Sequence, residues 1–315
     1  MQARRPAGSG VILITGAGGL LGANLAADIL RRGVEVTAAG HGCLPAFEGV
    51  QAVRCDLTAI DNIVSLFARS RPSCVIHCAA ATSVDSCESD PKYAWRVNME
   101  MSRHLASQAA ATGARFVYIS TDSVFDGNRG NYTETDQPTP INVYARTKLA
   151  GEAAVREASP GALVVRTNIY GWNMQPKLSL AEWMLGRLES GLETPGFSDV
   201  VFCPILVNDL GDAILEMIEK GLTGLYHVAG SEACSKLDFA MEVARVFGRD
   251  PALVRPASVE SARLRAPRPK NTSLCVSTIS RVLGRSMPSL NAGLERFKTL
   301  RANGFEAYLK HAGRE

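Results

Sequence analysis

The first half of the chain alternates short apolar runs with longer amphipathic segments, and this rhythm constrains the fold more than any other feature. The apolar runs have the length of strands and occupy residues 11–15, 34–38, 51–55, 73–79, 115–120 and 162–167. Helix-length segments such as LLGANLAADILRRG separate them. Repeated strand–helix units with almost continuously apolar strands are typical of a parallel sheet covered on both faces. The sequence therefore predicts an α/β fold with a doubly wound parallel sheet.

The turn between the first strand and the first helix is rich in glycine. The stretch VILITGAGGLLGANL places Gly16, Gly19 and Gly22 there. Such a turn lets the backbone approach a pyrophosphate closely and aims the helix N-terminus at its negative charge. We interpret it as the phosphate loop of a Rossmann-type dinucleotide site, with Leu20 and Leu21 as further contacts.

The pattern loosens after about residue 170. Helices are predicted near 178–190 and 207–220, and stretches marked by glycine and proline separate them. A chain of 315 residues is longer than the usual domain of about 100–200 residues. We expect a dinucleotide-binding Rossmann domain over residues 1–170. Residues 171–315 would form mainly a smaller substrate-binding lobe, interleaved with the last strands of the sheet.

The residues after the second and third strands bear on the choice of cofactor. A strict NAD site has Asp or Glu after the second strand, whereas this sequence has Gly40 and His41. This favours NADPH and leaves NADH open, because no arginine stands there to bind a 2′-phosphate. Asp56 and Leu57 follow the third strand. Asp56 would either contact the adenine amino group or cap the next helix.

Composition argues against several other classes of protein. The 34 basic and 31 acidic residues are spread along the chain and form no stripe for nucleic acid. The N-terminal ten residues lack the apolar core of a signal peptide, and no window approaches the roughly 18 apolar residues of a membrane span. The eight cysteines include no C-x-x-C pair, and the five histidines do not stand at ligand spacing from them. We expect a cytoplasmic protein with reduced thiols that binds neither metal, membrane nor nucleic acid.

The fifth strand and a later helix supply the candidates for catalysis. YISTDSVFDG presents Ser120, Thr121 and Asp122 at the carboxyl edge of the sheet, where open α/β sheets bind ligands. Tyr144 and Lys148 follow in INVYARTKLAGE and share one helix face, because they are four residues apart.

These motifs resemble the extended short-chain dehydrogenase/reductase superfamily, with its TGxxGxxG loop, its Ser/Thr after the fifth strand and its YxxxK pair. Four segments narrow the resemblance to the dTDP-4-dehydrorhamnose reductase family: HCAAATSVDSCESDPKYAWRVN, ISTDSVFDG, YTETDQPTPINVYARTKLAGE and RPKNTSL. They span nearly the whole chain. The resemblance implies an NAD(P)H-dependent reductase of a nucleoside-diphosphate 4-keto-deoxysugar, in a family whose members often form homodimers.

The resemblance also assigns catalytic roles. Tyr144 would give its proton to the carbonyl oxygen, and its pKa should be lowered by the neighbouring cation of Lys148 and by the oxidised nicotinamide. Lys148 would also hold the nicotinamide ribose hydroxyls. Thr121 would donate a hydrogen bond to the same carbonyl oxygen.

Further contacts follow from the same resemblance and from small residues near the sheet edge. The additional cofactor contacts would be Ala79, Ala80, Ala81, Asn98, Ser120 and Thr167, together with the catalytic Tyr144. The substrate contacts would be Thr82, Val84, Asp122, Ser123, Asn168 and Arg268. Asn98 would support the site structurally or take part in it directly. Arg268 lies in the basic stretch SARLRAPRPKNTSL, which would bind a diphosphate or form a solvated loop.

Two positions depart from the family pattern. Ser123 stands where related dehydratases have Glu, so a partner for elimination of water is missing. The reductases usually have an aromatic residue at this position, and often a tryptophan where this chain has Asn168 and Ile169. Trp172 would stack on the substrate from a shifted position or be buried in the core.

Two other functions stay open. The regulatory beta subunit of methionine adenosyltransferase resembles the same family and keeps the cofactor fold, so the chain could be a non-catalytic, cofactor-binding subunit. A sugar-nucleotide epimerase is the other alternative. The complete set of Thr121, Tyr144 and Lys148 favours the reductase, because a pure binding module has no need of the tyrosine–lysine pair.

Overall fold

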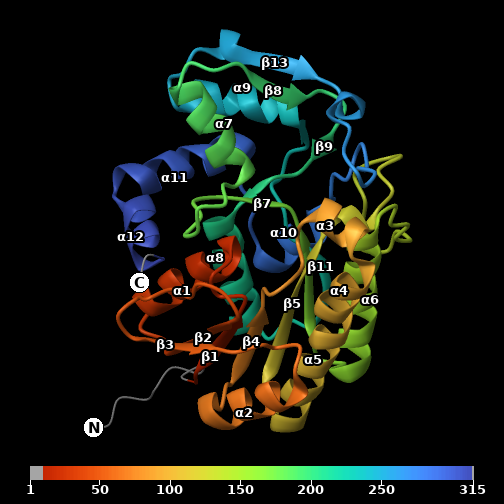
Figure 1. The fold of residues 1–315 in the computed structure, drawn as a ribbon, viewed down its shortest axis with the longest axis vertical. Coiled ribbons are helices and arrows are strands. Elements are labelled where there is room, and N and C mark those ends of the chain that lie inside the picture. Colours follow the sequence, from red (N-terminus) through yellow and green to blue (C-terminus); the bar gives the residue numbers. More distant parts are fainter. Residues whose placement is uncertain (1–9, 314–315) are drawn as a thin grey trace.

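The central feature of the computed structural model, which describes residues 10–313, is a seven-stranded parallel sheet (Figure 1). Its strands follow the order β11-β6-β5-β4-β1-β2-β3. They are β1 (Ile12–Thr15), β2 (Val36–Gly40), β3 (Val50–Arg54), β4 (Cys74–His77), β5 (Arg115–Thr121), β6 (Leu163–Thr167) and β11 (Gly224–His227). Each of the six predicted strands lies in this sheet, which confirms the predicted α/β fold.

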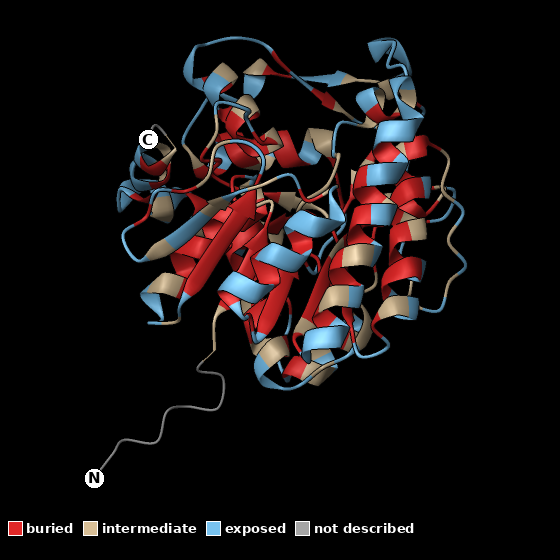
Figure 2. Cartoon of the chain, turned by 60° about the horizontal axis from the view of Figure 1, so that its bottom comes forward, coloured by how far each residue is buried: buried red, intermediate tan, exposed pale blue. Residues whose placement is uncertain are grey.

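Side chains of the strands point alternately to two apolar cores, because successive residues of a strand face opposite sides of the sheet. Ile14 packs with the helices of one side and Leu13 with those of the other. The first side has α1 (Leu20–Arg31), α8 (Val207–Glu219) and α10 (Ser277–Leu283); the second has α2 (Ile60–Ser70), α5 (Met101–Thr112) and α6 (Val143–Ala158). Figure 2 shows buried strands between helices whose outer faces are exposed.

The connection between β4 and β5 is helical for most of its length. It contains α3 (Val84–Ser89) and α4 (Pro91–Trp95), and a π-helical turn over Arg96–Glu100 leads into α5. Single π-helical turns often occur at functional sites. This turn lies beside α6, the helix that contains Tyr144 and Lys148.

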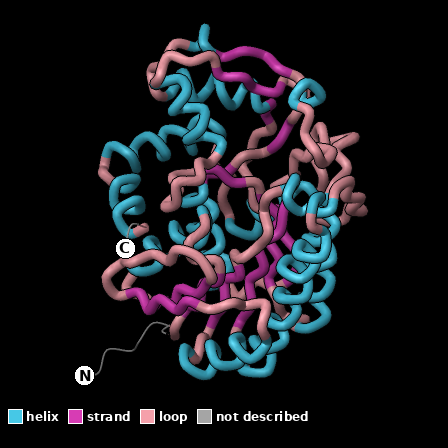
Figure 3. Tube along the Cα trace, in the orientation of Figure 1, coloured by secondary structure: helices cyan, strands magenta, loops and turns pink. Residues whose placement is uncertain are grey.

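The second half of the chain adds a smaller layer of helices and short strands at one end of the sheet (Figures 1 and 3). Three two-stranded pairs occur there: β7 with β10, β9 with β12, and β8 with β13. The strands are β7 (Ile169–Tyr170), β8 (Thr194–Phe197), β9 (Val201–Phe202), β10 (Ile205–Leu206), β12 (Cys234–Ser235) and β13 (Val254–Ala257). The helices are α7 (Leu180–Glu189), α9 (Lys236–Val246), α11 (Leu290–Ala302) and α12 (Phe305–Ala312).

Elements of both halves build the large sheet layer. β11 pairs with β6 although about sixty residues separate them, and α8 packs against α1. At the C-terminal end, α12 returns to the connection between β2 and β3, where the rings of Tyr308 and Phe47 stack with centroids 4.9 Å apart. The division of the chain into two domains near residue 170 stays a prediction.

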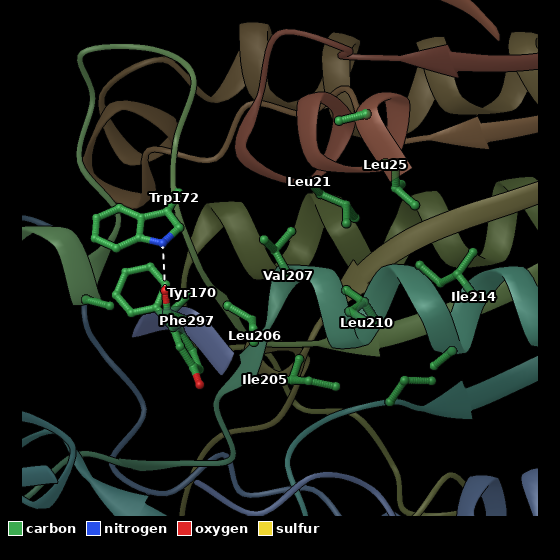
Figure 4. Packing of buried hydrophobic residues seen from close by; sticks show 14 of the residues in the cluster. Leu21, Leu25, Tyr170, Trp172, Ile205, Leu206, Val207, Leu210, Ile214 and Phe297 are labelled. Atoms are coloured by element: carbon green, nitrogen blue, oxygen red, sulfur yellow. Dashed lines mark hydrogen bonds between the residues drawn. The ribbon is translucent and has the colours of Figure 1, made fainter. Parts of the chain in front are cut away.

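Trp172 belongs to the apolar core between the sheet layer and α11 (Figure 4). Its side chain is only 2% exposed, and its ring stacks on Phe297 with centroids 3.9 Å apart. The indole Nε1 donates a hydrogen bond of 2.9 Å to the carbonyl oxygen of Phe297. Of the two interpretations of Trp172, the structure thus supports the buried aromatic.

Trp172→Phe should therefore affect stability rather than substrate choice. The smaller ring leaves a void and the carbonyl of Phe297 without its indole donor, so we expect a loss of about 1–3 kcal/mol in the free energy of unfolding. Urea denaturation measures it. A change in the preferred sugar substrate, with unaltered stability, would contradict the core position.

The eight cysteines are free thiols. Burial raises the pKa of Cys74 and of Cys78 to about 12, so these two thiols keep their protons at neutral pH. No helix within residues 10–313 is long and apolar enough to span a bilayer.

Candidate active site

A cavity of about 870 Å³ lies at the carboxyl ends of the parallel strands. The glycine loop, the connections after β2, β3 and β4, the ends of β5 and β6, helix α6 and residues 173–179 form its walls. Predicted site residues that line it are Gly16, Gly19, Leu20, Leu21, Gly22, His41, Asp56, Leu57, Ala79, Ala80, Thr82, Ser120, Thr121, Asp122, Ser123, Tyr144, Lys148, Thr167 and Asn168. Ala81, Val84, Asn98 and Arg268 are not among its lining residues.

The glycine loop leaves no room for side chains where it turns into α1. Gly16 has a φ of +65°, and a Cβ there would lie 2.5 Å from the amide nitrogen of Ala79. A Cβ on Gly22 would lie 2.4 Å from the carbonyl oxygen of Gly16. Gly19 caps α1 without a side-chain hydrogen bond, so side chains do not compete for the amides of its first turn. The loop has the form of a phosphate cradle at a helix N-terminus.

At the end of the cavity formed by the connections after β2 and β3, Asp56 does not cap helix α2. The N-cap of α2 is Ala59, and Oδ1 of Asp56 accepts hydrogen bonds from the amide and hydroxyl of Thr58 at 2.9 and 2.8 Å. These bonds, the amide first, lower the pKa of Asp56, and the charges of His41 and Arg96 lower it further. Two basic side chains therefore act on Asp56, and one of them, Arg96, comes from the distant π-helical turn.

Asn98 stabilises the connection after β4 by hydrogen bonds to its backbone. Its Oδ1 accepts a hydrogen bond of 2.8 Å from the amide of Ala81. Its Nδ2 donates to the carbonyl oxygen of Ala81 at 3.2 Å and to Oγ1 of Thr147 at 3.0 Å. Because Asn98 is fully buried, this geometry gives it a supporting position between the connection and α6.

Asp122 joins three separate parts of the chain. Its Oδ1 accepts hydrogen bonds from the hydroxyls of Thr121 (3.1 Å) and Ser123 (3.2 Å). Its Oδ2 accepts from Nδ2 of Asn168 (2.9 Å) and Oγ1 of Thr272 (2.6 Å). Burial raises the pKa of Asp122, whereas the four donors lower it. The carboxyl group therefore fixes the positions of the two hydroxyls and the amide that face the cavity.

Tyr144 lies one residue inside the N-terminus of α6. Asn142 is the N-cap, and its side chain accepts a hydrogen bond of 2.9 Å from the amide of Ala145. Burial raises the pKa of Tyr144 to about 12, the hydroxyl of Thr121 lowers it, and the carboxyl group of Asp122 raises it. The shift is opposite to the one expected from the sequence, because burial outweighs the neighbouring groups of the chain. The phenol keeps its proton at neutral pH.

Lys148 points toward β5. Its ammonium donates a hydrogen bond of 2.8 Å to the carbonyl oxygen of Ile119 and lies 4.0 Å from the ring centroid of Tyr118. Burial lowers the pKa of Lys148 to about 7, while the carboxylate of Glu152 raises it. The fraction of Lys148 that is protonated near pH 7 therefore depends on the groups that surround the amine.

Thr167 brings an unsatisfied hydroxyl to the cavity. It stands opposite Thr121 in the register of β5 and β6. Its Oγ1 is buried and has no hydrogen-bond partner within residues 10–313. Because buried hydroxyls are normally hydrogen-bonded, this group is available to a ligand in the cavity.

Arg268 lies against α3, away from the large cavity. Its Nη2 forms an ion pair of 2.9 Å with Oδ2 of Asp85, and its Nη1 donates to the carbonyl oxygen of Ala266. Arg268 lines a second cavity of about 510 Å³, together with Lys270 and Asn271. Its role as a phosphate contact stays a prediction.

Two parts of the cavity wall were not predicted from the sequence. Tyr93, Arg96 and Val97 line it from the connection between β4 and β5. Their i, i+3, i+4 spacing on a helix is the signal that could have indicated a common face. Five residues of the segment 173–179 also line the cavity: Asn173, Gln175, Lys177, Leu178 and Ser179. Nε2 of Gln175 donates a hydrogen bond of 2.8 Å to the carbonyl oxygen of Gly18. No motif in that segment marks it.

The chain is similar to several known proteins. Residues 10–301 match the family model of the RmlD substrate binding domain. The probable low-salt glycan biosynthesis reductase Agl14 of Haloferax volcanii is 34% identical over 285 residues, which are 89% of this chain and 95% of that protein. The methionine adenosyltransferase 2 subunit beta of Rattus norvegicus is 32% identical over 297 residues, which are 88% of this chain and 84% of that protein.

A solved structure gives the same result. The crystal structure of dTDP-4-dehydrorhamnose reductase from Bacillus anthracis in complex with NADP superimposes with a TM-score of 0.83 at 32% identity, over 92% of this chain and 99% of that chain. These matches confirm the resemblance that the motifs indicate. The chain belongs to the RmlD substrate-binding-domain family, the dTDP-4-dehydrorhamnose reductase-like members of the extended short-chain dehydrogenases/reductases.

Proposed function

We propose that this protein is an NAD(P)H-dependent reductase of a nucleoside-diphosphate 4-keto-deoxysugar. One observation supports this most directly: Thr121, Tyr144 and Lys148 line the same cavity as the glycine loop. A hydride donor and a proton donor must act on one carbonyl group, so they must share one site. The names of two relatives, a glycan biosynthesis reductase and a dTDP-4-dehydrorhamnose reductase, support the same reaction class.

The residues of the cavity fit a nicotinamide dinucleotide. The turn at Gly16 and Gly22, which a Cβ would fill, suits a pyrophosphate, and the unpartnered hydroxyl of Thr167 suits a polar group of the ligand. When bound, the reduced cofactor supplies a hydride. In this proposal Lys148 holds the nicotinamide ribose hydroxyls from α6.

Proton transfer is the task of Tyr144 in this mechanism. Because burial raises its pKa to about 12, the phenol is present in the protonated form that a general acid requires. It would donate its proton to the carbonyl oxygen as the carbonyl carbon accepts a hydride. Thr121 would stabilise the charge that develops on the same oxygen.

NADPH is the proposed cofactor, with NADH as the weaker alternative. No carboxylate follows β2, where a strict NAD site would have one. His41 and Arg96 both lower the pKa of Asp56 beside that position, so basic side chains are available near the adenosine end of the cavity. The NADP in the structure of the Bacillus anthracis relative supports the same choice.

The proposed substrate is a nucleotide sugar rather than a nucleic acid or a membrane component. Thr82, Ser123 and Asn168 line the cavity and would contact the substrate, with Asn168 on its diphosphate. Val84, the first residue of α3, would also contact the substrate, and Arg268 beside that helix would contact its diphosphate. We also propose that the protein acts in the cytoplasm and, as is common in the family, as a homodimer.

A panel assay tests the proposal. NADPH oxidation is followed at 340 nm with several nucleoside-diphosphate 4-keto-deoxysugars, each with NADH in parallel. We expect turnover with at least one sugar, and faster turnover with NADPH than with NADH. Absence of turnover with every sugar, despite tight cofactor binding, would contradict the reductase function.

The second candidate is a non-catalytic, cofactor-binding regulatory subunit. The similarity to the rat methionine adenosyltransferase 2 subunit beta favours it. Stable association with a catalytic partner protein, together with an inactive panel, is the outcome expected for that function. A lack of any such partner, together with sugar turnover, is the outcome expected for the reductase.

A further inference from the structure

A buried ion pair lies directly behind the candidate catalytic residues. Nε of Arg166 donates to Oε1 of Glu152 at 2.9 Å, and its Nη2 donates to Oε2 at 2.7 Å. The two side chains are only 3% and 6% exposed. Arg166 also lies 5.2 Å from the ring centroid of Phe125, and its Nη1 is 3.5 Å from Nε2 of His227. The guanidinium group is thus held in β6 by a bidentate bond and by aromatic packing.

The carboxylate of this pair reaches the active-site cavity in two ways. Oε1 of Glu152 accepts a hydrogen bond of 2.5 Å from the hydroxyl of Ser120, which lines the cavity. Glu152 also follows Lys148 by four residues on α6, so the two side chains share one face of the helix. Ser120 therefore binds the carboxylate of Glu152 from β5, while Lys148 lies one helical turn before Glu152 on α6.

Few other charged or titratable groups face the amine of Lys148. On α6 these are Tyr144 and Glu152; on β5 the ring of Tyr118 lies against the amine. At the end of β4, Cys78 and His77 interact with it electrostatically. Burial raises the pKa of the Cys78 thiol to about 12 and lowers the pKa of His77 to about 3, so both groups are neutral at pH 7. Glu152 is then the anion beside the amine.

We propose that Glu152, fixed by Arg166 and Ser120, is the positioning residue that favours the cationic form of the buried amine of Lys148. The proposal rests on the proposed function only in that Lys148 acts there as a cation. Water cannot stabilise that cation, because Lys148 is only 2% exposed. A fixed carboxylate one helical turn away stabilises it instead, while the bidentate bond to Arg166 holds that carboxylate in place.

This role explains why an ion pair is buried at this position, which its contribution to stability does not explain. A buried ion pair contributes little net stability, since the desolvation of both ions offsets their attraction. The same pair placed beside a lysine that titrates near neutral pH controls the charge of that lysine.

The experiment measures the titration of Lys148 directly. The chain is labelled with 13Cε-lysine, the Lys148 signal is assigned by its loss in Lys148→Arg, and its chemical shift is followed from pH 5 to 11. In wild type we expect a midpoint near 7. In Glu152→Gln we expect a midpoint lower by about one pH unit or more, because the neutral amide no longer stabilises the cation.

A matched control is Glu157→Gln, which removes the same charge from an exposed position of the same helix. Its Lys148 midpoint should equal that of wild type. An unchanged midpoint in Glu152→Gln, or an equal shift in both variants, would overturn the proposal.

A double variant provides a second test in case Glu152→Gln does not fold. Glu152→Gln leaves Arg166 buried without its partner, whereas Glu152→Gln/Arg166→Met removes both charges together. A midpoint lower than in wild type is expected in the double variant, and an unchanged midpoint there again overturns the proposal.

The titration needs no substrate, so it separates this proposal from the proposed function. A shifted midpoint in a protein that turns over no sugar would retain the role of Glu152 and reject the reductase. Sugar turnover by wild type, together with an unshifted Lys148 midpoint in Glu152→Gln, would support the reductase and reject the role of Glu152. Ser120→Ala, which removes a hydrogen bond and no charge, should move the midpoint less than Glu152→Gln.

Discussion

A Tyr144→Phe variant is expected to lose about 10²–10⁴-fold in kcat for ketone reduction, while its affinity for NADPH stays at the wild-type value. Phenylalanine keeps the ring and its packing but has no proton to give. The carbonyl oxygen would then have to take its proton from water, while the hydride donor stays in place. Because the phenol is protonated at neutral pH, the loss should be of similar size across pH 6 to 8.

The measurement combines two assays on one preparation. Cofactor affinity is measured by NADPH fluorescence, and kcat by NADPH oxidation with the best sugar of the panel. Tyr308→Phe is the matched control, since that tyrosine lies on α12 and packs on Phe47, outside the residues that line the cavity. Wild-type kcat in Tyr144→Phe would reject Tyr144 as the proton donor, and weakened NADPH binding would assign it to the cofactor site instead.

The fold was predictable because its main signals are local. Strand-length apolar runs alternate with helices, and this pattern alone requires a parallel sheet covered on both faces. The glycine loop also follows from local geometry, since the left-handed backbone at Gly16 and the close approach at Gly22 admit no side chain. The spacing of Tyr144 and Lys148 places both on one helix face at the cavity.

The features that escaped prediction depend on contacts between distant residues. Asp122 receives a hydrogen bond from Thr272, 150 residues further along, and no pattern in the sequence links the two. Gln175 reaches the glycine loop from a segment without a motif. The direction of the pKa shift of Tyr144 depends on its burial in the assembled cavity, which a spacing rule does not contain.

Arg166 shows the same limitation most clearly. In the sequence it is a single charge inside an apolar strand, and only the fold brings it to Glu152, fourteen residues away on a helix. A charged residue in the middle of a central strand should have signalled a buried partner, because charged groups are buried only when paired. The partner's identity required the structure.

Arg166→Met is expected to lower the free energy of unfolding by about 3–5 kcal/mol, which is the usual effect of leaving one ion of a buried pair without its partner. Methionine fills most of the volume but offers no donor to the two oxygens of Glu152. In Glu152→Gln/Arg166→Met neither charge of the ion pair remains, so most of the lost stability should return. Urea denaturation of the two single variants, the double variant and wild type gives the coupling energy directly.

Arg245→Met provides the comparison that makes this result specific. Arg245 forms the same bidentate contact with Glu242, with distances of 2.9 and 2.7 Å, but its side chain is 59% exposed. Its removal should change stability by less than about 1 kcal/mol, because water screens an exposed pair and solvates the remaining carboxylate. Equal losses in Arg166→Met and Arg245→Met would mean that burial does not decide the strength of these pairs. A double variant no more stable than Arg166→Met would mean that the loss comes from packing in β6 and not from the unpaired carboxylate.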